Sequence, residues 1–186
     1  MSRYAQFFIR SKRLTSQKPL ALIDGAKLES FFSELLADNT ISTELKLFVF
    51  VAASGGLRVT EALSLSKEDF FEQDGCLFFT SKVLKKRKEE TRFARVHPSV
   101  AEWVKENIKL KVGCLIKKNS STLYRNLRRL FPPGICNHSL RHSLVSYLLF
   151  EKDMSNMKVA KLINIGVKTV EHYAHLDQRK TLKGIF

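Results

Sequence analysis

The stretch Leu45–Ala53 constrains the fold more than any other part of the sequence. It reads LKLFVFVAA, so a helix over these residues would be apolar on most of its sides. Such a helix has to be covered by other elements, which predicts a central core helix that begins near Ser42. Ser54-Gly55-Gly56 then ends it at a sharp turn. The 186 residues suffice to bury this helix within one domain.

Weaker periodic patterns predict further helices around the central one. In each, apolar residues recur at helical spacing behind a residue that commonly caps a helix start. The expected starts are Asp24, Pro98 with a Ser99–Glu102 capping box, Ser120 or Ser121, Asn137, and Ser155.

Residues 67–97 have the character of strands. Asp74-Gly75 is a hairpin turn signal between two aromatic-rich runs, Asp69–Glu72 and Cys76–Thr80. Thr91–Val96 alternates between apolar and polar residues as a third strand would. We therefore expect an α+β fold, mainly α-helical, with a small three-stranded antiparallel sheet.

The charge balance indicates the class of partner. Thirty-two Lys and Arg residues against eighteen Asp and Glu give a net charge of +14. Such an excess favours a polyanion, most often nucleic acid. An anionic membrane surface is the competing partner, but the sequence has no convincing basic amphipathic helix or lipidation motif. We therefore expect DNA rather than a membrane.

The sequence offers no sign of export or of a metal centre. No apolar stretch approaches the roughly 18 residues that span a bilayer, and the N-terminus lacks a signal-peptide core. Cys76, Cys114 and Cys136 are an odd number without paired spacing, which argues against a disulfide framework or a zinc site. We expect a cytoplasmic protein without metal or cofactor.

Two short motifs carry groups suited to binding phosphate. Arg58 stands two residues after Gly56, with Leu57 between them, and Glu61 comes one helical turn later. His138 and Arg141 are three residues apart near a predicted helix start, a favourable position for an anion. Each motif also has an ordinary interpretation, as a surface ion pair or as the capped end of a core helix.

Two basic segments could contact a DNA backbone. The segment Lys82–Arg95 contains seven basic residues and two acidic ones, and the helix from Ser120 has an arginine stripe. A solvated loop or helix face is the ordinary alternative. The residues that we assign to DNA binding are Lys85, Lys86, Arg87, Lys88, Arg125, Arg128 and Arg129.

Three segments in a fixed order resemble the catalytic domain of the tyrosine recombinases, the phage-integrase family. GLRVTEALSL (56–65) is similar to the first arginine motif of that family. HSLRHS (138–143) is similar to its second, and VKTVEHYAH (167–175) to its nucleophile segment. The resemblance covers about residues 21–175, with the basic hairpin between the first two motifs.

The resemblance implies a role for each matching residue. Arg58 and Arg141 would stabilise the charge that develops on a cleaved phosphodiester, with Glu61 supporting them. Tyr173 would be the nucleophile, and because the pKa of tyrosine is near 10 it needs a base or cationic surroundings. His138 would assist proton transfer or bond the phosphate. The lysine that protonates the leaving 5′-hydroxyl would be Lys82, with Lys85 and Lys86 as alternatives.

Two features depart from the family pattern. Asn164 stands nine residues before Tyr173, where the family usually has histidine or tryptophan. Asparagine can still donate a hydrogen bond, and His172 and His175 are the candidates to compensate for the missing ring. The family also usually has an N-terminal helical domain, whereas about 20 residues precede the first catalytic-domain helix here.

These observations lead to one expected organisation and function. We expect a basic arm or linker remnant over residues 1–20, the catalytic domain over 21–175, and a tail over 176–186 that docks on a neighbouring protomer. The resemblance implies a site-specific recombinase acting on double-stranded DNA as a tetramer through a 3′-phosphotyrosine. A catalytically weakened DNA-binding member and a relaxing enzyme of type IB topoisomerase chemistry are the alternatives.

Overall fold

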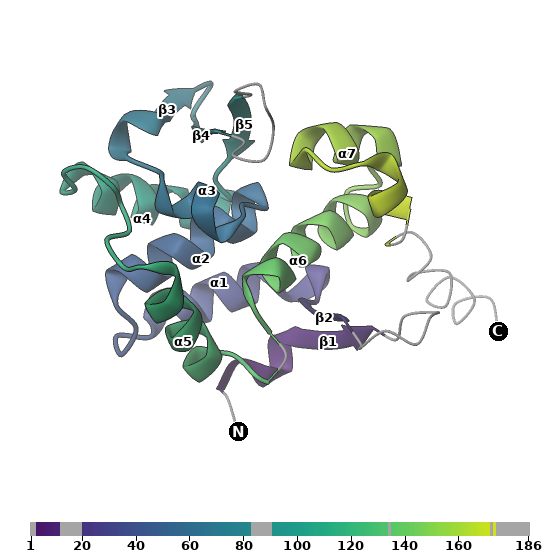
Figure 1. Cartoon of the computed structure of the whole chain (residues 1–186), viewed down its shortest axis with the longest axis horizontal. Coiled ribbons are helices and arrows are strands. Elements are labelled where there is room, and N and C mark those ends of the chain that lie inside the picture. Colours follow the sequence, from purple (N-terminus) through teal and green to yellow (C-terminus); the bar gives the residue numbers. More distant parts are fainter. Residues whose placement is uncertain (1–2, 12–19, 83–90, 134, 172, 174–186) are drawn as a thin grey trace.

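The computed structural model describes residues 3–11, 20–82, 91–133, 135–171 and 173 of the chain (Figure 1). It confirms the expected mainly helical α+β fold with a three-stranded antiparallel sheet. The α-helices are α1 (Leu28–Ala37), α2 (Thr43–Gly55), α3 (Val59–Leu63), α4 (Pro98–Lys109), α5 (Ser120–Leu130), α6 (Asn137–Phe150) and α7 (Asn156–Ile163). The strands are β1 (Phe8–Ser11), β2 (Leu20–Ile23), β3 (Phe70–Gln73), β4 (Cys76–Lys82) and β5 (Thr91–Arg95). Short 3₁₀ turns are η1 (Arg3–Phe7), η2 (Gly25–Lys27) and η3 (Lys67–Asp69).

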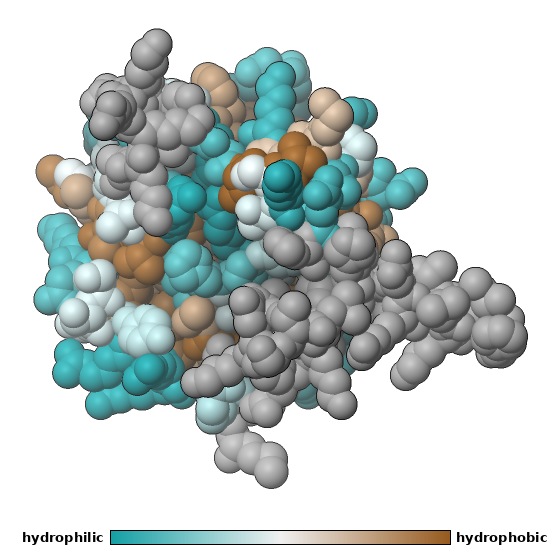
Figure 2. All heavy atoms as spheres, turned by 45° about the vertical axis from the view of Figure 1, so that its right-hand side comes forward, coloured by the Kyte–Doolittle hydropathy of each residue, from teal (hydrophilic) through white to brown (hydrophobic). Residues whose placement is uncertain are grey.

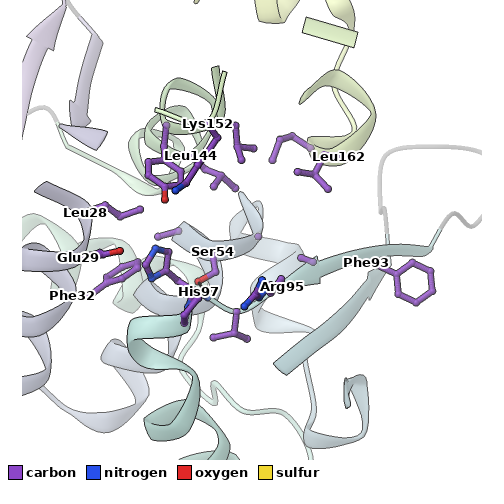
Figure 3. A pocket seen from close by; sticks show the side chains of 18 residues that line it. Leu28, Glu29, Phe32, Ser54, Phe93, Arg95, His97, Leu144, Lys152 and Leu162 are labelled. Atoms are coloured by element: carbon purple, nitrogen blue, oxygen red, sulfur yellow. Dashed lines mark hydrogen bonds between the residues drawn. The ribbon is translucent and has the colours of Figure 1, made fainter. Parts of the chain in front are cut away.

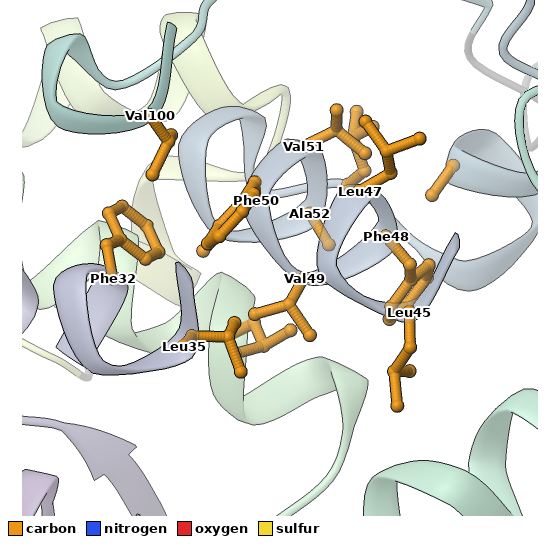
Figure 4. Close-up of a cluster of buried hydrophobic side chains, with 14 of the residues drawn as sticks. Phe32, Leu35, Leu45, Leu47, Phe48, Val49, Phe50, Val51, Ala52 and Val100 are labelled. Atoms are coloured by element: carbon orange, nitrogen blue, oxygen red, sulfur yellow. The ribbon is translucent and has the colours of Figure 1, made fainter. Parts of the chain in front are cut away.

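Helix α2 lies at the centre, as its sequence predicts. Ser42 caps it by accepting a hydrogen bond from the backbone N–H of Leu45, and residues 45–53 are all buried (Figure 4). Helices α1, α3, α4 and α6 and strand β5 all contact it. Lys46 is buried within this run and donates to the Leu36 carbonyl at 2.7 Å, which satisfies its ammonium group.

The end of α2 brings the later parts of the chain close together. Gly56 takes a left-handed conformation with φ of 58°, which favours glycine. A Cβ atom there would lie 3.2 Å from Leu144 of α6 and 3.3 Å from Ile163 of α7. The turn before Arg58 is therefore packed directly against both C-terminal helices.

The three-stranded sheet confirms the predicted hairpin and third strand. Strand β4 pairs antiparallel with β3 and β5, and Asp74 and Gly75 form the turn with positive φ angles of 49° and 68°. Ser81 and Arg92 are opposite one another in this register, and both are buried. The inward face of the sheet therefore carries polar groups at its β4–β5 end.

The described part of the expected N-terminal arm is folded rather than extended. Residues 3–7 form η1, and β1 pairs antiparallel with β2 as a two-stranded sheet that the sequence did not predict. Tyr4 and Phe7 are buried in the core, and the Tyr4 hydroxyl donates to Asp38 at 2.8 Å. The segment is rich in basic residues, and the residues that Tyr4 and Phe7 pack against are far away in the sequence. Its folded structure was therefore not predicted.

Three predicted caps differ in the structure. Helix α6 has Cys136 as its N-cap, because Asn137 instead donates from its side chain to the Leu57 carbonyl. Helix α4 is capped by His97, with Pro98 as its first residue, so the Ser99–Glu102 capping box does not form. Asp24 precedes only the 3₁₀ turn η2, and its side chain makes no capping bond.

The buried Tyr4–Asp38 bond predicts a measurable acid sensitivity. Hydrogen bonds from Thr40 and Tyr4 lower the pKa of Asp38 to about 2, so its contribution is present above the unfolded pKa near 4 and is lost as the pH falls toward 2. Tyr4→Phe should cost about 1 kcal/mol at pH 7 by urea unfolding, and less near pH 2.5. The exposed Gln6→Ala is the control. An equal loss at both pH values would contradict the assignment.

Candidate active site

The carboxylate of Glu61 is the centre of a buried charge cluster. Its side chain is only 3% exposed, and guanidinium groups from three elements surround it. Arg58 at the start of α3 lies 2.6 Å away, Arg92 of β5 at 3.7 Å and Arg141 of α6 at 4.0 Å. One negative charge therefore faces three positive ones, so the cluster has an excess of two positive charges.

Arg58 is the most accessible of the three arginines. It is the N-cap residue of α3, and Glu61 fixes it twice, by accepting from its backbone N–H at 2.8 Å and from its guanidinium. Its side chain remains 24% exposed. Glu61 thus contacts Arg58 directly, and the guanidinium keeps access to solvent.

Arg141 is deeply buried and bonds to backbone carbonyls. Its guanidinium donates to Gly56 at 2.5 Å, to Ile163 at 2.8 Å and to Asn164 at 3.4 Å. Burial, followed by repulsion from Arg58 and Arg92, lowers the pKa of Arg141 to about 10. The group therefore stays protonated at neutral pH, and an entering anion would stabilise it.

Arg92 belongs to the cluster although the sequence analysis gave it no role. It donates to the Ile163 carbonyl at 2.9 Å, and burial lowers the pKa of its guanidinium. Its Nε and Nη2 atoms and the facing Ser81 hydroxyl are buried without a hydrogen-bond partner among the described residues. The available signal was its place in an alternating strand, where Arg92 shares the inward side with Ala94.

Tyr173 is buried beside α6, and its hydroxyl contacts Nδ1 of His142. The two rings lie 5.1 Å apart between centroids. His138, the predicted partner, lies one turn earlier on α6 and is exposed, with its ring 6.2 Å from that of His142. His142 is thus a second residue that the sequence analysis missed, and its only signal was its position next to Arg141.

Asn164 serves the site through its backbone. It ends α7 in a left-handed conformation with φ of 54°, which asparagine tolerates better than most residues. Its carbonyl and that of Ile163 both accept from Arg141. The end of α7 is therefore fixed against the arginine cluster, nine residues before Tyr173.

The structure describes only some of the residues that were predicted to bind DNA. Lys82 is exposed at the end of β4. Arg125, Arg128 and Arg129 are exposed on α5, where Arg128 lies over the Tyr124 ring at 4.6 Å. Four predicted residues, Lys85, Lys86, Arg87 and Lys88, lie outside the described residues, as do His172's side chain and His175.

A separate pocket of about 390 Å³ opens between α1, α2 and β5 on one side and α6 and α7 on the other (Figure 3). Leu28, Phe32, Leu144 and Leu162 give it an apolar lining, and His97 points toward it. Of the residues predicted to be catalytic, none lines it among the described part of the chain. The charge cluster, not this pocket, is the candidate site.

The described residues include neither a metal-binding cluster of side chains nor a membrane-spanning helix. They contain no group of three or more histidine, cysteine, aspartate or glutamate side chains placed to hold a metal. None of their helices combines the length and apolar character needed to cross a membrane.

With the α7 side turned forward, hydrophilic side chains dominate the visible described surface, with smaller hydrophobic areas between them (Figure 2).

The family model of the phage integrases matches residues 21–180, which is most of the chain. This chain belongs to the phage integrase family. The match includes the segments 56–65, 138–143 and 167–175. A comparison with curated protein sequences gave no match.

Solved structures of tyrosine recombinases share the fold of this phage-integrase chain. XerH bound to difH in a post-cleavage complex aligns with a TM-score of 0.66 and 20% identity, covering 88% of this chain and 52% of that chain. XerA recombinase gives 0.66 and 17%, covering 91% and 63%. The catalytic domain of bacteriophage HP1 integrase gives 0.55 and 20%, covering 78% and 83%. This chain thus spans about half the length of the XerH chain.

The charge cluster predicts a large effect of neutralising Glu61. Glu61→Gln keeps the shape but leaves three buried or half-buried guanidiniums without a counter-charge, so we expect a loss of about 3–5 kcal/mol in urea unfolding. Adding Arg92→Met should recover part of this loss, because one of the repelling cations is removed. The exposed Glu68→Gln is the control. Additive losses in the double variant would contradict the coupling.

Proposed function

We propose that this chain is the catalytic part of a site-specific DNA recombinase, which breaks and rejoins strands through a covalent 3′-phosphotyrosine. One observation carries the proposal. The guanidiniums of Arg58 and Arg141, from motifs far apart in the sequence, both lie against Glu61. Two guanidinium groups that are protonated at neutral pH and lie close together suit a phosphodiester, because its non-bridging oxygens gain negative charge as it is attacked.

The electrostatics of the cluster support an anionic substrate. Three guanidiniums and one carboxylate leave two positive charges in a poorly solvated site. The lowered pKa of Arg141 reports that repulsion together with its burial. A phosphodiester carries one negative charge, so its binding relieves the repulsion and stabilises the protonated arginines.

The proposed reaction follows from the residues around the cluster. The Tyr173 oxygen attacks the phosphorus, Arg58 and Arg141 stabilise the pentavalent transition state, and the 5′-hydroxyl leaves. Lys82, exposed at the end of β4, is the described lysine that we assign as proton donor to that hydroxyl. The energy of the cleaved bond is kept in the phosphotyrosine, so religation requires no metal, cofactor or water.

The proposed partners are double-stranded DNA and further copies of the chain. Exchange between two duplexes requires four cleavage events, which favours a tetramer on DNA. The basic residues of α5 and of the segment after Lys82 would hold the backbone of the duplex. Docking of the 176–186 tail on a neighbouring protomer is part of this proposal, and that tail lies outside the described residues.

A DNA-binding member with weakened catalysis is the second candidate function. Asn164 favours it, because the side chain at this position has no imidazole or indole to offer the phosphate. Its backbone nevertheless helps to hold Arg141. Salt-sensitive DNA binding without any covalent product on a cognate site would support this candidate over the first.

Trapping the covalent intermediate tests the first proposal. A nicked suicide DNA, from which the short fragment with the new 5′-hydroxyl diffuses away, should accumulate a protein–DNA adduct visible in a denaturing gel. Tyr173→Phe should abolish this adduct, whereas Tyr124→Phe, on the exposed face of α5, should retain it. Arg58→Lys and Arg141→Lys should each slow its formation about 10²-fold or more. An adduct that persists in Tyr173→Phe would refute the nucleophile assignment.

The arginine stripe of α5 predicts a change in salt dependence. Replacing Arg125, Arg128 and Arg129 with alanine should weaken DNA binding and reduce the slope of log K against log salt by about 3, one per lost phosphate contact. Lys67→Ala/Lys109→Ala, a pair beside β3 and α4, is the control. Fluorescence anisotropy at several salt concentrations measures both. An unchanged slope in the triple variant would remove α5 from the interface.

A further inference from the structure

Among the described residues, the Tyr173 hydroxyl contacts an imidazole that lies outside the predicted catalytic set and can accept its proton. Nδ1 of His142 contacts that hydroxyl, and the ring planes meet at 43° with centroids 5.1 Å apart. Tyr173 is buried and His142 is half-buried, so this pair is shielded from bulk water. The contact joins α6 directly to the segment after α7.

A phenol in this position needs a base before it can attack. An ordinary tyrosine is almost entirely protonated at neutral pH, whereas an ordinary histidine, with a pKa near 6.5, is mostly neutral and can accept a proton. A general base has to lie within hydrogen-bond reach of the proton that it removes. His142 meets that requirement, while His138 is exposed one helical turn away.

We propose that His142 is a catalytic residue: its Nδ1 atom accepts the phenolic proton of Tyr173 as the tyrosine attacks the phosphodiester. This inference rests on the proposed function and adds the base to it. His138 is then left to contact the phosphate or to support the neighbouring imidazole, whose ring it faces at 6.2 Å and 29°.

The step balances in protons and bonds. The O–H bond of Tyr173 breaks as the N–H bond on His142 forms, and the new phosphorus–oxygen bond forms as the bond to the 5′-oxygen breaks. The 5′-oxygen takes its proton from the general acid, for which Lys82 is our candidate. Religation is the reverse: the imidazolium of His142 returns its proton to the departing phenol while the lysine takes one from the attacking 5′-hydroxyl.

The titratable and charged groups around His142 determine how the pH dependence of the cleavage rate is interpreted. The phenol of Tyr173 faces it from the segment after α7, and His138 faces it from its own helix. Its neighbour Arg141 directs its guanidinium to the carbonyls of Gly56 and Ile163. An acid limb in the cleavage rate could therefore arise from either histidine, and variants of both are needed.

The test compares His142→Asn with His138→Asn in single-turnover cleavage of the suicide DNA between about pH 5.5 and 8.5. The asparagine side chain keeps a hydrogen-bonding atom near the position of Nδ1 but cannot accept a proton at these pH values. We expect His142→Asn to slow adduct formation about 10²–10⁴-fold at pH 7.5 and to lose the acid limb. His138→Asn should keep that limb. Fluorescence anisotropy on the same DNA measures the affinity of each variant, so that a loss of binding is separated from a loss of cleavage.

A second variant separates proton transfer from packing. His142→Ala should form adduct slowly, and added imidazole should restore part of the rate, which a purely structural role would not allow. Any of three results would overturn the assignment of His142 as the base but leave the proposed function intact. These are a wild-type rate in His142→Asn, loss of the acid limb only in His138→Asn, and no rescue of a folded His142→Ala by imidazole. A wild-type protein that forms no adduct at any pH would overturn the proposed function, and this inference with it.

Discussion

The whole site depends on one buried carboxylate. Glu61 is 3% exposed and attracts guanidiniums from α3, β5 and α6 at once. Removing three guanidiniums and a carboxylate from water is costly, and that cost is offset only where each charge also finds hydrogen bonds. Gly56, Ile163 and Asn164 supply them through carbonyls at the ends of α2 and α7. The cluster therefore forms only where these elements meet, which ties the chemistry to the complete fold.

The carbonyl of Ile163 shows how distant segments are held together. It accepts from Arg92 on the hairpin strand and from Arg141 on the helix with both histidines. The hairpin carries the candidate general acid, and the chain continues from Ile163 to the nucleophile. One backbone oxygen thus holds β5 and α6 together. In the proposed reaction, the hairpin would donate a proton on one side of the phosphate and α6 would accept one on the other. A change at Arg92 is expected to act through this positioning rather than through contact with the substrate.

Local patterns in the sequence were enough for the central helix, the hairpin and the Arg58–Glu61 contact. Three features depend on residues that are close together in the sequence, so they can be predicted from it. They are the apolar run of α2, the Asp74-Gly75 turn and the Arg58–Glu61 contact. Arg92, His142 and the buried Tyr4 depend on partners far along the chain. The strand position of Arg92 and the place of His142 beside Arg141 do not reveal those partners. The helix caps show the same limit: Asn137 is a good cap by residue type, but the Leu57 carbonyl competes for its side chain.

The unequal exposure of the three arginines suggests an order of events at the site. Arg58 is 24% exposed, whereas the Arg92 and Arg141 side chains are 7% and 6% exposed and already bond to carbonyls. In the proposed reaction, an incoming phosphate would meet Arg58 first and compete with Glu61 for its guanidinium. The phosphate would then bring negative charge toward Arg141 and so compensate for the burial of that guanidinium and its repulsion from the other arginines. The phenol of Tyr173 contacts His142, so the proposed nucleophile and its proposed base are already paired. On this proposal the anion site and the nucleophile are assembled separately, and the substrate would bring them together.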